Sequence, residues 1–134
     1  MILSFIFIFL AAICNSIMDI TNHHFSDSIF SKLNHTWWNG EISWKNKYIN
    51  REYKWGRRKL FNTKINFPVQ LTDAFHFFKT LMIVFICLSI ITFDKCHFYK
   101  YCNITAINYL MGLIIYGTLW NLTFSLFYNS LLKK

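Results

Sequence analysis

The chain has 134 residues, enough for one domain, and 54% of them are hydrophobic and 20% aromatic. A soluble domain of this size has too little interior to hide so many apolar side chains, so the composition excludes an ordinary soluble globular protein. The net charge is +8, and most of the charged residues lie between apolar blocks. This segregation predicts a single all-α membrane domain with three transmembrane helices.

The first predicted span covers residues 2–24. Ile, Leu and Phe dominate it, and no charged residue precedes Asp19. We favour a retained span over a secretory signal peptide because the chain does not open with Lys or Arg. Near its end, Asn15, Asp19 and His23 recur at every fourth position, which places them on one face of the helix.

A polar segment over residues 25–68 follows the first span. Between Ile20 and Gln70 there are nine basic residues and three acidic ones. Beside a span, this balance indicates a cytoplasmic loop near anionic lipid headgroups and disfavours a nucleic-acid-binding surface. Its Trp and Tyr side chains are typical of the membrane interface. We therefore expect a basic, aromatic-rich interfacial loop whose partners are membrane lipids.

The second and third predicted spans cover residues 69–93 and 106–132. At ~1.5 Å per helical residue, each can cross a hydrocarbon core of ~30 Å. The positive-inside rule places residues 25–68 and the C-terminus in the cytoplasm and the N-terminus outside. Cys96 and Cys102 fall in the short outer segment, where an oxidising compartment would allow a disulfide.

Ionisable residues near the ends of the first two spans predict a functional site, because charge at membrane depth is costly. Asp73 and His76 are three residues apart and share a helical face, which Lys79 extends. Since the first two spans are antiparallel, this pair should lie at the same depth as Asp19 and His23.

The third span carries a further polar stripe. Asn121, Ser125 and Asn129 recur at every fourth position and could face the same centre as the other two clusters. The alternative is that these residues only form hydrogen bonds between helices.

Two carboxylates and two imidazoles suit Zn²⁺, or alternatively Mn²⁺ or Fe²⁺. We predict Asp19, His23, Asp73 and His76 as metal ligands, with the two aspartates as catalytic residues. Water on an open coordination position would become a nucleophile, which predicts a metal-dependent hydrolase acting at the cytoplasmic face on a lipid or lipid-linked substrate. The candidate substrate-binding residues are Asn15, Lys79, Asn121, Ser125, Arg57 and Arg58.

The same residues also have simpler interpretations. The histidines would sit in headgroup water without binding a metal, and Asp73, which follows Thr72 near a helix start, would cap the helix. Three spans with a basic, aromatic collar also suit a non-enzymatic homo-oligomer that forms a pore or perturbs the membrane, as a phage or defence effector does. A scaffold that docks a partner through the loop is a further alternative.

Three runs of the sequence resemble a group of small uncharacterised bacterial and phage integral membrane proteins. The runs are WNGEISWKNKY (Trp38–Tyr48), LTDAFHFFK (Leu71–Lys79) and LWNLTFSLFY (Leu119–Tyr128). The resemblance covers most of the chain and implies a bacterial inner-membrane or phage setting. It implies no particular activity and adds no catalytic residue.

Overall fold

The computed structural model describes residues 2–61, 63–93 and 105–134, so Cys96 and Cys102 lie outside the described residues. Within these ranges, three helices are long and apolar enough to cross a membrane, and no β-strand is present. They are α1 (Ile2–His23), α4 (Ala74–Ile91) and α6 (Thr105–Leu126). A π-helical turn, Phe127–Leu131, continues α6. The prediction of an all-α fold with three membrane helices is confirmed.

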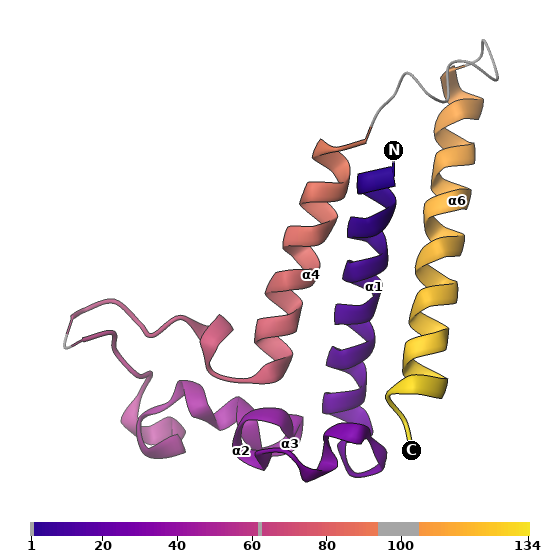
Figure 1. The fold of residues 1–134 in the computed structure, drawn as a ribbon. Coiled ribbons are helices and arrows are strands. Elements are labelled where there is room, and N and C mark those ends of the chain that lie inside the picture. The colour runs from indigo at the N-terminus through magenta and orange to yellow at the C-terminus, as the bar shows by residue number, and fades with distance from the viewer. Residues whose placement is uncertain (1, 62, 94–104) are drawn as a thin grey trace.

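Helix α1 lies between the other two long helices and packs against both of them (Figure 1). Ala11 and Ala12 in its middle are completely buried, because small side chains allow neighbouring helix backbones to approach closely. α4 runs antiparallel to α1, and α6 runs parallel to α1, so the long loop and the C-terminus lie at the same end of the bundle (Figure 1).

Hydroxyl groups join the three spans at the end remote from the loop. Ser4 Oγ on α1 donates to the Ser89 carbonyl oxygen on α4 at 2.8 Å, and Ser89 Oγ donates to the Ser4 carbonyl oxygen at 3.1 Å. The hydroxyl of Tyr116 on α6 donates to Ser4 Oγ at 2.7 Å. Such bonds supply specific contacts where all apolar surfaces are equally soluble in lipid.

The first half of the loop docks against the bundle. Phe25 and Phe30 form a buried cluster with Ile20 of α1 and Leu132 near the C-terminus, and Phe30 stacks on Trp38 with ring centroids 4.7 Å apart. This docked half consists of short helical turns: Phe25–Asp27, Ile29–Lys32, α2 (His35–Trp38), α3 (Gly40–Ser43) and Trp44–Lys47.

Backbone hydrogen bonds join the docked half to the C-terminus. The Ile29 N–H donates to the Leu132 carbonyl at 2.9 Å, and the Lys134 N–H donates to the Asp27 carbonyl at 2.7 Å. The chain end and the loop therefore form one structure below the spans.

Residues 48–67, which we call the arm, extend sideways from the bundle (Figure 1). The arm contains the turns Ile49–Arg51 and Tyr53–Trp55 and two isolated antiparallel bridges, Tyr48 to Arg57 and Lys59 to Asn66. A last turn, Val69–Leu71, leads into α4. α4 itself begins only at Ala74, because Asp73 has an extended backbone and acts as its N-cap.

Candidate functional site

The start of α4 contains the buried carboxylate of Asp73, of which 1% is exposed. Its Oδ1 accepts the backbone N–H of His76 at 2.9 Å, the bond expected of a helix N-cap. Its Oδ2 accepts from the Thr72 hydroxyl at 2.9 Å. The predicted capping role of Asp73 is confirmed, and the carboxylate has donors on both oxygens.

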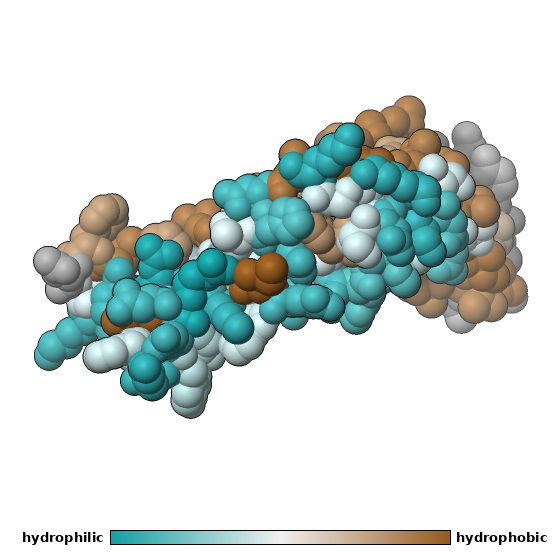
Figure 2. All heavy atoms as spheres, turned by 90° about the horizontal axis from the view of Figure 1, so that it is seen from below, coloured by the Kyte–Doolittle hydropathy of each residue, from teal (hydrophilic) through white to brown (hydrophobic). Residues whose placement is uncertain are grey.

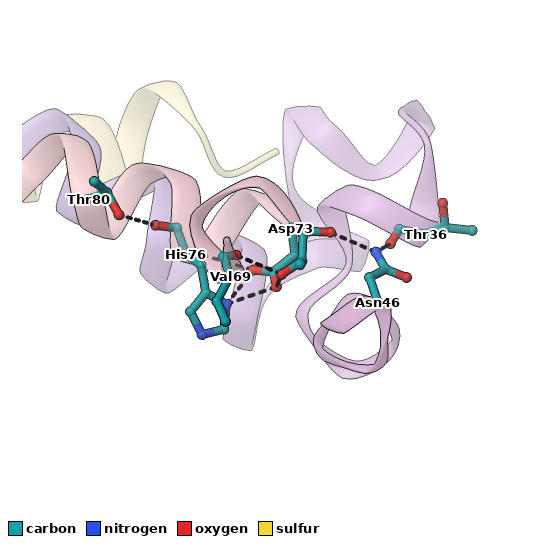
Figure 3. Close-up of polar contacts among 7 residues, drawn as sticks. Thr36, Asn46, Val69, Asp73, His76 and Thr80 are labelled. Carbon is teal, nitrogen blue, oxygen red and sulfur yellow. Dashed lines mark hydrogen bonds and ion pairs between the residues drawn. The ribbon is translucent and has the colours of Figure 1, made fainter. Parts of the chain in front are cut away.

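The ring of His76 pairs with the same carboxylate (Figure 3). Its Nδ1 lies 2.8 Å from Asp73 Oδ2 and 2.9 Å from Oδ1. An ionised carboxylate only accepts hydrogen bonds, so Nδ1 is the donor, and in the neutral ring Nε2 then has a free lone pair. The His76 side chain is 30% exposed, so part of the ring reaches the surface while its partner stays buried.

Asn46, a side chain from the loop, holds the backbone next to Asp73 in place. The Asn46 amide nitrogen donates to the Thr72 carbonyl at 2.8 Å and to the Thr36 carbonyl (Figure 3). The Thr72 hydroxyl shares its proton between Asp73 and the Val69 carbonyl. Sequence analysis missed Asn46, because nothing in the spacing of residues 46 and 72 indicates that they meet.

Two further side chains continue the His76 face along α4. The Thr80 hydroxyl donates to the His76 carbonyl at 3.0 Å. Lys79 is exposed, and its Nζ lies 5.9 Å from the centre of the Phe75 ring. The predicted cation therefore lies on the helix surface, one turn beyond His76, with its ammonium group over an aromatic ring.

The other two predicted metal ligands lie elsewhere. Asp19 is half-buried, and its carboxylate has no hydrogen bond or ion pair with any described residue. His23 is exposed at the end of α1 and bonds to Asn22. Across the described parts of the chain, no three His, Cys, Asp or Glu side chains are grouped so that they could hold a metal ion. The structure brings together only Asp73 and His76, because helix capping orients that carboxylate towards its own helix.

His23 instead lines a separate hollow of about 360 Å³ with His35 and Glu41 of the docked half. His35 there bonds to the Ser31 carbonyl at 3.0 Å. Sequence analysis assigned no partner to His35. Its proximity to His23 depends on how the docked half folds under α1, and no local pattern predicts that.

The polar stripe of α6 does not face the bundle. Asn121 and Ser125 are exposed, whereas Thr123 of the same helix is buried. Asn129 donates to Ser125 Oγ at 3.1 Å, so part of the stripe is satisfied within the helix. The three polar stripes therefore do not converge on one centre, because α6 turns a different face towards α1.

The remaining candidates are scattered. Asn15 is half-buried on α1, and Arg57 and Arg58 are exposed on the arm. The backbone of Arg57 forms an isolated antiparallel bridge with that of Tyr48. The guanidinium carbon of Arg58, Cζ, lies 5.6 Å from the centre of the Phe67 ring.

Comparison with protein-family models, curated protein sequences and solved structures finds no match to this chain. The resemblance to small bacterial and phage membrane proteins stays a prediction. The functional proposal therefore rests on the geometry around Asp73 and His76.

Proposed function

We propose that this integral membrane protein is a hydrolase that acts at the cytoplasmic face of the bacterial inner membrane on a lipid or lipid-linked substrate. The observation that carries the proposal is the Asp73–His76 pair, in which a buried carboxylate holds Nδ1 of a surface-reaching imidazole at 2.8 Å. A histidine oriented in this way is suited to general-base catalysis. Its ring is held in the tautomer that carries the proton on Nδ1, which leaves Nε2 able to accept a proton.

In this reaction, His76 Nε2 takes a proton from a water molecule as the water oxygen attacks the substrate. The resulting imidazolium is stabilised by Asp73, which remains ionised. Lys79 lies one turn further along α4, where an ammonium group would offset negative charge that develops on a phosphate or carbonyl oxygen. The leaving group then takes up the proton from His76.

A metal-dependent form of the proposal assigns Asp73 a different role from the predicted one. A Zn²⁺, Mn²⁺ or Fe²⁺ ion would bind to His76 Nε2, and Asp73 would orient the ring through Nδ1 rather than bind the ion. Asp19 and His23 would complete the ligand set only by moving towards His76, because the described structure does not bring them together.

The proposed orientation rests on the charges at one end of the bundle. The basic loop and the terminal Lys133 and Lys134 lie at the end where α4 begins. The positive-inside rule favours the cytoplasm for that end, so His76 would meet substrate from the inner leaflet.

The test is hydrolysis of a panel of phospholipids and lipid-linked phosphates by the purified protein in mild detergent. His76→Gln should lower the rate by about 10²-fold or more, and His35→Gln, which removes an imidazole outside the pair, should not. Elemental analysis of the wild type, Asp19→Ala and His76→Ala distinguishes the two forms of the proposal: stoichiometric metal lost in these variants supports the metal-dependent one. No turnover of any substrate, or equal rates for His76→Gln and the wild type, contradicts a hydrolase.

A second candidate function is a homo-oligomer that forms a pore or perturbs the membrane. The observation that favours it is the exposed stripe of Asn121 and Ser125 on α6. Polar side chains on a lipid-facing surface are better satisfied against another helix than in hydrocarbon. A second copy would supply such a helix.

This candidate predicts that the protein is larger than a monomer in detergent by light scattering. Asn121→Leu with Ser125→Ala should shift it towards the monomer and reduce ion leakage from vesicles, whereas Leu122→Ala, at a neighbouring exposed position, should not. A monomeric wild type that causes no leakage would exclude it.

A further inference from the structure

The arm folds back on itself and surrounds an open hollow of about 870 Å³. The Ile49 N–H donates to the Gly56 carbonyl and the Arg58 N–H donates to the Lys47 carbonyl, each at 3.0 Å. This pairing brings Arg51 from one segment beside Arg58 and Lys59 from the next, and all three line the hollow. We call it the cation hollow.

The charge of the cation hollow is not neutralised by the protein. Glu52 is the only acidic residue of the arm, and it is occupied elsewhere: its Oε2 lies 2.8 Å from Lys54 Nζ and accepts from Trp55 Nε1 at 3.0 Å. No carboxylate among the described residues lies within ion-pair distance of the three cations that line the hollow. Lys59 donates to the neutral Asn66 amide oxygen at 2.8 Å, which positions the ammonium group and leaves its charge free.

The backbone at the edge of the hollow adopts a disfavoured conformation. Asn50 and Arg51 both have positive φ angles, 50° and 60°. Asparagine tolerates the left-handed region, whereas arginine rarely adopts it. Strained backbone of this kind persists where the surrounding structure holds it and is concentrated at binding sites.

The position of the arm indicates which kind of anion would reach the cation hollow. The arm belongs to the hydrophilic face at the loop end of the bundle, as Figure 2 shows. Tyr53, Trp55 and Phe61 of the arm are nevertheless exposed, Tyr53 by 78% and Phe61 by 89%. Cations interleaved with exposed aromatic rings beside membrane spans are characteristic of segments that lie in the headgroup layer.

We infer that the cation hollow binds the phosphate of an anionic phospholipid headgroup. Two guanidinium groups offer paired N–H donors that match phosphate oxygens, and the ammonium of Lys59 adds a third contact. The site lies on the arm and does not include Asp73 or His76, so it stands independently of the proposed hydrolase. It would fix the arm on the surface of the inner leaflet.

The test is native mass spectrometry of the full chain in mild detergent, titrated with phosphatidylglycerol or phosphatidylcholine. The site variant is Arg51→Gln/Arg58→Gln/Lys59→Gln. The matched control, Lys32→Gln/Lys45→Gln/Lys64→Gln, removes the same charge from the same loop outside the hollow. Circular dichroism of both variants checks that the helices are retained.

The wild type should bind phosphatidylglycerol in preference to phosphatidylcholine. The site variant should bind it at least about tenfold more weakly, since it removes the paired guanidinium donors and the ammonium group that would contact one phosphate together, and the control variant should retain most of the affinity. Equal losses in both variants would show diffuse attraction and overturn the proposal. Displacement of the lipid by millimolar inorganic phosphate would overturn the assignment to a lipid headgroup.

Discussion

The two halves of the long loop are both rich in aromatic residues, yet only the first half packs against the spans. In the docked half, Phe25 and Phe30 are buried against α1 and the C-terminus, whereas no described residue of the arm is buried. The docked half, residues 25–47, has three basic residues, and the arm has six. The free-energy cost of removing several unpaired cations from water exceeds the free energy gained by burying a few aromatic rings. Local charge density therefore decides which half docks.

The sharpest test of this comparison makes the same substitution in both halves. Phe30→Ala should lower the free energy of unfolding by about 3 kcal/mol, since Phe30 is 9% exposed and its removal leaves a cavity. Phe61→Ala removes a side chain that is 89% exposed and should change it by less than about 0.5 kcal/mol. Thermal unfolding in detergent measures both. Similar losses would mean that the arm also docks.

The next effect concerns the close approach of the docked half to α1. A Cβ added at Gly40 would lie 2.7 Å from Asn22 Oδ1 and 2.8 Å from Asn22 Cα. Gly40→Ala should therefore push the docked half away and destabilise the protein by about 1–3 kcal/mol. Gly117→Ala, where the new Cβ meets no atom within 4 Å apart from its own stretch of helix backbone, is the matched control. Limited proteolysis should cleave the loop faster in Gly40→Ala alone, and unchanged cleavage would contradict the close contact.

A smaller effect is expected at the start of α4. Asp73→Ala removes the N-cap and the partner of His76 and should cost about 1–2 kcal/mol. Asp27→Ala, which changes an exposed aspartate in the docked half, should cost almost nothing. Chemical unfolding followed by circular dichroism compares them. If Asp73→Ala matches the wild type, the observed hydrogen bonds do not stabilise α4.

The smallest effect is expected from the hydroxyl contacts between spans. Ser4→Ala removes hydrogen bonds to Ser89 and Tyr116 and should cost about 0.6–1.7 kcal/mol, between the average and the largest value measured for interhelical bonds in membranes. Ser130→Ala, at an exposed position, is the control. A shift in unfolding midpoint that is no larger for Ser4→Ala than for Ser130→Ala would assign the packing to α1's small residues alone.

Hydropathy and local chemistry by themselves determined the three spans, the basic loop between the first two, and the cap at Asp73. Each depends on residues close together in the chain: an apolar run long enough to cross lipid, or a carboxylate three residues before the N–H that it accepts. These features can therefore be predicted without knowing which distant segments of the chain pack against them.

Only the tertiary structure decided which polar residues meet. A repeat at every fourth position shows that Asn121 and Ser125 share a face, but the rotation of α6 about its own axis decides what that face contacts. Packing of α1 against α4 and α6 set that rotation, and it left this stripe exposed. The bond from Asn46 to Thr72, and the separation of His23 from His76, likewise depend on contacts between distant segments, which no periodicity in the sequence encodes.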